Sequence, residues 1–184
     1  NGNTHSETLL PMVESVLRCT GKTVDDIDLF AVSAGPGSFT GVRIGVATVK
    51  GLAFGKGKPC VGVSTLEALA ENLVPTGGLL CPVMNARRGQ VYNALFRVEN
   101  GALTRLCPDR ALSVKELEAE LLTCSEPVTL CGDGAELVKN SFTKCSAALP
   151  PLTLMEQNAA SVALCAARQK EILENAAGLT RPDG

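Results

Sequence analysis

The sequence of 184 residues has no tryptophan, one tyrosine and one histidine, and aromatic residues make up 3% of it. So few rings leave little material for a surface on which nucleobases stack. An excess of positive charge is also absent, because seventeen lysines and arginines face nineteen acids and give a net charge of −2. Chains that bind nucleic acid on their own are normally clearly basic, so the composition argues against autonomous nucleic-acid binding.

Long apolar runs are missing as well. The longest weakly polar stretch, residues 41–55, is interrupted by Arg43 and Lys50, and no run approaches the roughly 18 residues needed to cross a bilayer. The 45% of hydrophobic residues is enough for a globular core. We therefore expect one domain or two small ones, with no secretory signal and no membrane contact.

Eight cysteines are present, but none are arranged as Cys-x-x-Cys, and His5 is the lone histidine. Most of the cysteines stand in apolar runs, as Cys81 and Cys131 do. We expect them to be buried free thiols in a reducing cytoplasm, with no zinc site. A Ser-His-Asp or Cys-His catalytic set would have to use His5, and the sequence marks no partner for it.

The order of predicted elements favours an α/β fold with parallel strands at its start. Helices are expected over 4–18, 39–55 and 64–73, with strands at 29–34 and 61–63 between them. Residues 75–78, rich in proline and glycine, are the best domain boundary. Beyond it we expect the following elements: strands 79–85 and 90–98 joined in a hairpin by 87–89, a turn at 99–101, a helix over 113–123, a strand at 128–131, and helices over 135–140 and 158–174.

The most informative loop is 35–38, which follows a strand and opens a helix. Glycine permits positive φ, and free N–H groups at a helix start favour an anion, so Gly35, Gly37 and Ser38 are candidates for a nucleotide or anion loop. The loop lacks the lysine of a Walker motif and the third glycine of a dinucleotide fingerprint. A tight strand-to-helix turn without a ligand is the other interpretation.

The helix after this loop carries glycines four residues apart, at Gly41 and Gly45 and again at Gly51 and Gly55. Each glycine costs about 1 kcal/mol relative to alanine inside a helix, so close approach by another element should compensate. That element is either the protein's own sheet or another subunit.

Two groups of charged residues are candidate binding sites. Asp25, Asp26 and Asp28 form either a solvated turn or a magnesium site. Arg87 and Arg88 could join the lysines at 50, 56 and 58 in a basic patch that touches RNA. Neither group forms a convincing catalytic constellation.

Several motifs in order resemble the TsaB family, also called YeaZ. The most specific is the run AGPGSFTGVRIG at 34–45. It is accompanied by HSE at 5–7, LLPMV at 9–13, KGLA at 50–53, GVSTL at 62–66, MNARRGQVY at 84–92 and GDG at 132–134.

The resemblance implies an actin-like, Hsp70-like ATPase fold with two RNase-H-like lobes, here 1–77 and 78–184, the last helix packing back on the first lobe. The family's opening strands have no counterpart in this sequence, so the first lobe is expected to be incomplete at its start. Asn85 and Gln90 replace two acids that the family usually carries on the hairpin.

The resemblance also implies a non-catalytic subunit that binds the TsaD-like transferase. With a TsaE-like ATPase, that complex adds threonylcarbamoyl to the adenosine next to the anticodon of tRNAs reading codons that begin with A. The implied contact with tRNA is indirect, no cofactor is intrinsic, ATP or ADP binds only in the assembled complex, and a homodimer is plausible in isolation. The implied partner interface consists of Leu9, Leu10, Val13 and Leu17 on the first helix and Val42, Arg43, Val46 and Val49 on the second.

Two other functions remain open at this point. One is an enzyme in its own right, a weak ATPase or a glycoprotease-like metallopeptidase, for which the 35–38 loop is the strongest support. The other is an interaction protein that acts outside tRNA modification, for which the sequence offers no signal.

Overall fold

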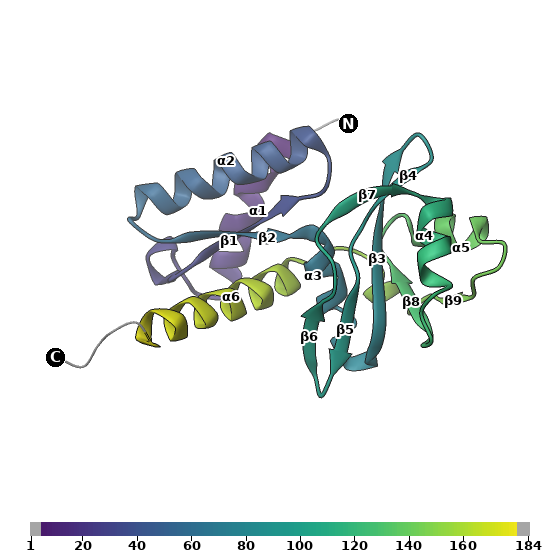
Figure 1. Ribbon diagram of the computed structural model, residues 1–184. Helices are drawn as coiled ribbons and strands as arrows, with labels where there is room; N and C mark the ends of the chain where they lie inside the picture. The colour runs from purple at the N-terminus through teal and green to yellow at the C-terminus, as the bar shows by residue number, and fades with distance from the viewer. Residues whose placement is uncertain (1–4, 180–184) are drawn as a thin grey trace.

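A computed structural model describes the backbone of residues 5–179 and the side chains of residues 8–172. The strands form two separate sheets (Figure 1). β1 (Phe30–Gly35) and β2 (Cys60–Ser64) make a parallel pair, and seven later strands make the second sheet. We call the part built on β1 and β2 the N-terminal lobe and the part built on the larger sheet the C-terminal lobe.

The N-terminal lobe has helices on both sides of its two strands. α2 (Phe39–Gly55) lies above them and α6 (Ala159–Leu179) below them in Figure 1, while α1 (His5–Cys19) contacts α2. The last helix therefore packs on the sheet formed by residues near the start of the chain. α1 ends before Gly21, whose φ of +63° suits glycine.

The predicted elements of the N-terminal lobe are confirmed, with one change. α2 and β1 lie where the apolar pattern places them, and the Ser64 side chain caps α3 (Thr65–Glu71) by accepting the Glu67 N–H at 3.2 Å. α3 ends at Glu71 rather than at residue 73. The described residues also contain three short 3₁₀ turns: η1 (Val24–Asp26), η2 (Val74–Thr76) and η3 (Leu152–Leu154).

The fully buried core of the N-terminal lobe is small. The cluster under its strands consists of Val63, Ala68, Cys165 and Ala166, so α6 supplies half of it. An ion pair fixes α6 to α3 beside this cluster: Arg168 binds Glu71, whose side chain is 9% exposed. The hydrogen bond to Glu71 raises the pKa of Arg168 and keeps it charged.

Replacing Arg168 by alanine is expected to destabilise the protein by about 1–3 kcal/mol, because a nearly buried carboxylate loses its partner. The figure is below that for a fully buried pair because Arg168 is 39% exposed. Urea unfolding measures the loss. The double variant Glu71→Gln/Arg168→Ala should recover part of it, and a double variant as unstable as the sum of the single changes would contradict the pairing.

The C-terminal lobe is organised around β3 (Gly78–Arg87). One edge of β3 pairs with β4 (Gln90–Asn93) and β5 (Phe96–Glu99), and the other pairs in parallel with β8 (Val128–Cys131). Its six consecutive residues 79–84 are buried, and all of them except Pro82 belong to the main core. The remaining elements are β6 (Ala102–Arg105), β7 (Arg110–Ser113), β9 (Ala147–Ala148), α4 (Val114–Leu121) and α5 (Ala135–Ser141).

The prediction of one strand over 90–98 is wrong, because the chain forms β4 and β5 with a break at residues 94–95. Both strands keep one register against β3, and the break lies opposite Cys81 and Pro82. Pro82 has no N–H to donate, so the ladder is interrupted there. The buried Asn93 amide donates instead to the Pro82 carbonyl at 3.2 Å.

Several other predictions for this lobe are confirmed, but three strands were not predicted. The hairpin, the turn at Asn100 and Gly101, strand 128–131 and the helix capped by Ser113 are confirmed. β6, β7 and β9 were missed, since each is short and none has more than one fully buried residue.

The expectation that most cysteines are buried is wrong. Cys81, Cys131 and Cys165 are buried, whereas Cys19 and Cys60 are exposed and the other three are half-buried. All eight are free thiols. Burial raises the pKa of Cys131 and of Cys165 to about 12, so neither is a ready nucleophile.

Candidate functional site

The main concavity lies between the two lobes and consists of two neighbouring cavities of about 650 and 560 Å³. Both are lined by Gly37 and Ser38 from the β1–α2 loop and by Met84 and Asp133 from the C-terminal lobe. The larger one continues along the β3–β4 hairpin to Arg87, and the other extends under α1 and α2. We call the pair the interlobe cleft.

The β1–α2 loop forms the N-terminal wall of this cleft. Gly35 has a φ of +115°, and a Cβ on Gly37 would lie 3.3 Å from Val42 Cγ2, so both glycines suit a tight turn. The Ser38 hydroxyl accepts the Gly41 N–H at 3.4 Å and caps α2. Of the three predicted loop residues, Gly37 and Ser38 face the cleft, whereas Gly35 lines a separate groove against β7. Anion binding by this loop stays a prediction.

The C-terminal wall is the loop between β8 and α5, residues 132–134. Gly132 has a φ of +95°, and a Cβ there would lie 2.4 Å from the Val83 carbonyl oxygen. Asp133 accepts the Asn85 N–H at 3.2 Å, and the Asn85 side chain accepts the Arg87 N–H at 2.8 Å. The loop is thereby fixed against the base of the β3–β4 hairpin.

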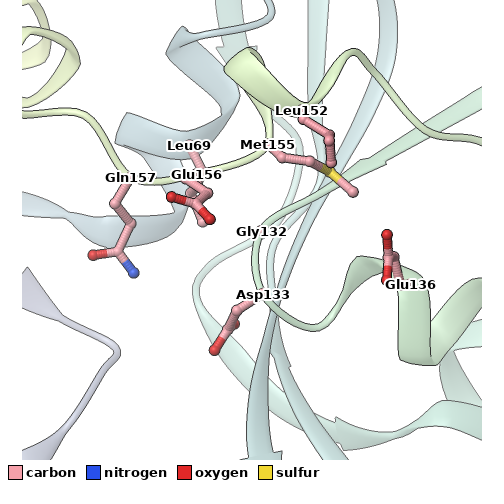
Figure 2. Close-up of a pocket in the computed structure, with 8 residues that line it drawn as sticks. All are labelled: Leu69, Gly132, Asp133, Glu136, Leu152, Met155, Glu156 and Gln157. Carbon is pink, nitrogen blue, oxygen red and sulfur yellow. The ribbon is translucent and has the colours of Figure 1, made fainter.

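A third cavity, of about 520 Å³, lies on the other side of this loop (Figure 2). Its walls carry three carboxylates, Asp133, Glu136 and Glu156, together with apolar side chains and Gln157. None of its lining residues is basic. Carboxylates repel phosphate, so the charge of this cavity is unfavourable for a nucleotide polyphosphate.

A polar network joins the two lobes beside the cleft. The Ser64 hydroxyl donates to Asp109 at 2.7 Å, and Arg105 bridges Asp109 at 2.5 Å and Glu67 at 3.1 Å. Burial alone would lower the pKa of Arg105, but its hydrogen bonds to these two acids outweigh burial and raise it. The Arg105 guanidinium also lies 4.6 Å from the centroid of the Phe96 ring. Ser64 is therefore used in capping and in linking the lobes.

The predicted interface residues all lie on α1 and α2, and none is fully buried. Leu10 and Arg43 are exposed, and the other six are half-buried. Sequence reasoning missed four apolar side chains of these helices that are more than 60% exposed: Phe54 at 91%, Phe39 at 71%, Met12 at 64% and Val16 at 63%. The signal that could have identified these side chains is a large apolar residue on the side of the helix that otherwise carries polar residues.

The glycines of α2 differ in what they face. A Cβ on Gly45 would lie 3.5 Å from Val32 of β1, so this glycine faces the protein's own sheet. A Cβ on Gly51 or Gly55 would meet nothing within 4 Å. These two glycines leave a smooth open surface beside Phe54.

The prediction that the hairpin arginines and the lysines form one basic patch is wrong. Lys56 pairs with Asp25 at 2.8 Å and Lys58 donates to the Asp25 carbonyl at 3.3 Å, at the end of α2. The arginines of the hairpin instead lie beside the start of this 17-residue helix. α2 separates the two groups by about 25 Å.

The acidic turn is a solvated one. Asp25 is held by Lys56, and Asp26 accepts the Thr23 N–H at 2.8 Å, which lowers the pKa of Asp26. Within the described residues, no group of three or more histidine, cysteine, aspartate or glutamate side chains could hold a metal ion. The side chain of His5 lies outside the described side chains.

Comparison with known proteins identifies the family to which this chain is similar. A family model described as TsaD, tRNA N6-adenosine threonylcarbamoyltransferase, matches residues 2–181. Over 135 residues, 73% of the chain is 38% identical to the Bacillus subtilis tRNA threonylcarbamoyladenosine biosynthesis protein TsaB. The protein of the same description from Escherichia coli is 43% identical over 100 residues, which are 53% of the chain. The chain belongs to the TsaB (YeaZ) family.

The share of a relative's length that the match covers differs between relatives. The match spans 59% of the Bacillus protein and 43% of the Escherichia protein. An uncharacterized protein of Mycobacterium tuberculosis is 31% identical over 172 residues, covering 88% of the chain and 80% of that protein.

A solved structure agrees on the fold. YeaZ from Pseudomonas aeruginosa superposes with a TM-score of 0.78 at 26% identity, covering 92% of the chain and 79% of that structure. The family therefore confirms the predicted α/β, actin-like fold. In the described part of the chain, no helix combines the length and the apolarity needed to span a bilayer.

Proposed function

We propose that this chain is a non-catalytic partner subunit in the formation of threonylcarbamoyladenosine in tRNA, and that it binds a TsaD-type transferase. Relatives described as tRNA threonylcarbamoyladenosine biosynthesis proteins support the pathway. The transferase reaction, a TsaE-like ATPase as further partner and an indirect contact with tRNA belong to the same proposal. The chain alone is expected to hold no nucleotide.

The observation that carries the proposed protein contact is the apolar surface of α1 and α2. Val16 and Met12 are more than 60% exposed on α1, and Phe54 is 91% exposed on α2. Large apolar side chains this exposed on two contacting helices are typical of a surface that binds a partner. We call these three residues and the open glycines Gly51 and Gly55 the α1–α2 face.

The shape of the α1–α2 face suits another helix. Helix axes approach within about 8 Å only where small residues meet, and Gly51 and Gly55 have open space above them. Burial of Phe54 and Val16 beside that contact would supply the apolar area of a stable interface. A second copy of the chain would meet the same chemistry, so a homodimer in isolation is compatible with the proposal.

The experiment that tests the proposal is light scattering after size exclusion, with the chain alone and mixed with the TsaD-type protein of the same organism. A stable one-to-one species is the expected result. Reconstituted threonylcarbamoylation of tRNA should then require both proteins. Activity of the transferase that is equal with and without the chain would overturn the proposal.

The alternative of an independent ATPase or metallopeptidase gains no specific support. The Ser38 hydroxyl is engaged in capping α2, and the third cavity is acidic. The ATPase alternative would be supported if the purified chain hydrolysed ATP and lost this activity when the β1–α2 loop was changed.

A further inference from the structure

One arginine lines the larger cavity of the interlobe cleft, and two more are adjacent to residues that line it. Arg87 lines the cavity and Arg88 follows it at the tip of the β3–β4 hairpin. Arg43 lies across the cleft on α2, where its guanidinium is 4.2 Å from the centroid of the Phe39 ring. All three are exposed, and among the described side chains none of them forms an ion pair.

Phe39 gives this surface a flat aromatic element. Its ring is 71% exposed, lines the same cavity as Arg87 and carries Arg43 on one face. An exposed phenylalanine costs solvation free energy, and Phe39 stays 71% exposed although Arg43 lies over one face of its ring. Aromatic rings and guanidinium planes are the groups on which proteins stack unpaired nucleobases.

The interior of the cavity is polar rather than cationic. Asp133, Asn85 and the half-buried Tyr92 line it. A phosphate beside Asp133 would meet its carboxylate, whereas amino groups of a base could donate to it. A cavity of about 650 Å³ with Arg87 at one end therefore suits a base near Asp133 better than a phosphate.

We propose that the surface formed by Phe39, Arg43, Arg87 and Arg88 binds single-stranded RNA directly, with a base in the cavity and the phosphates on the arginines. A free nucleotide is a poorer fit, because Arg43 and Arg88 are not among the residues that line the cavity and would lie beyond its reach. A chain of successive phosphates reaches all of them. This direct contact takes the place of the indirect contact with tRNA in the function proposed above. It does not depend on the proposed protein contact, and either can fail alone.

The net charge of −2 sets the expected strength. Three phosphate contacts to a single strand give a slope of about −2 in a plot of log affinity against log salt concentration. Binding by the chain alone is thus weak and sensitive to salt. In an assembled complex it would add to contacts made by other subunits.

The test is fluorescence anisotropy with a labelled oligoriboadenylate of about twelve nucleotides, titrated between about 50 and 200 mM salt. Arg87→Ala/Arg88→Ala should weaken binding and reduce the steepness of the salt slope by about 1.4. Phe39→Ala should weaken binding about 5- to 150-fold with little change in slope. Arg43 stays in place, because it also belongs to the predicted partner interface.

Matched controls separate this surface from general electrostatics. Lys115→Ala/Lys139→Ala removes two exposed charges from α4 and α5, and Leu122→Ala removes an exposed apolar side chain at the end of α4. Both should bind RNA like the unmodified chain. Equal losses in test and control variants, no detectable RNA binding, or equal competition by an acidic peptide would each overturn the inference.

The same preparations, mixed with the transferase subunit, show whether the failure is of the RNA contact or of assembly. The Arg87→Ala/Arg88→Ala variant should form the one-to-one complex as the unmodified chain does. A complex that forms normally and loses no RNA affinity with this variant would overturn the RNA contact while leaving the proposed function intact.

Discussion

Replacing Phe54 or Val16 by glutamate is expected to abolish binding of the transferase subunit, with a loss of about 100-fold or more in affinity. Both side chains are largely exposed in the chain alone, at 91% and 63%, so a carboxylate there costs little before binding. In the complex it would be buried without a partner, which costs several kcal/mol. Titration followed by light scattering or calorimetry measures the loss.

The control for this pair is Leu137→Glu on α5, where the leucine is 45% exposed in the other lobe. It introduces the same charge and should leave binding unchanged. Thermal unfolding should give the same midpoint for all three variants and the unmodified chain. Normal assembly by both test variants would show that the partner binds elsewhere.

Replacing Gly132 by alanine is expected to lower the free energy of unfolding by more than about 3 kcal/mol. The new Cβ would lie 2.4 Å from the Val83 carbonyl oxygen, and the φ of +95° is strained for any side chain. The strain alone is worth about 1–3 kcal/mol, and relieving the clash must displace β3 or the loop that carries Asp133. Urea unfolding with the linear extrapolation measures the loss.

Gly57→Ala separates the two causes. Gly57 has a φ of +59°, but a Cβ there would meet nothing within 4 Å. It should lose only the strain of a left-handed conformation, about 1–2 kcal/mol. Equal losses at the two glycines would mean that β3 and the loop adjust freely, and that the cleft wall is less rigid than the contact implies.

The sequence alone determined those elements whose signal is local. The apolar run of β1, the helix starts at Ser64 and Ser113, and the Asn100–Gly101 turn follow from neighbouring residues, and the structure agrees with each. The family followed from a run of unusual residues at 34–45 and was confirmed by relatives at 38–43% identity.

The tertiary structure decided whatever depends on residues far apart in the chain. The break between β4 and β5 follows from Pro82 on the neighbouring strand, which periodicity along residues 90–98 does not contain. Arg87 lines the same cavity as Phe39, the ring that carries Arg43, although the sequence grouped Arg87 and Arg88 with lysines, two of which lie at the other end of α2.

The face of a helix that stays open is decided in the same way. Spacing placed Gly45 and Gly51 in similar small-residue rows, yet one packs on Val32 and the other faces open space. Likewise Phe54 is a large apolar residue and is nevertheless 91% exposed. Local pattern specifies helix and strand because the backbone period is local, whereas burial depends on which elements later cover a face.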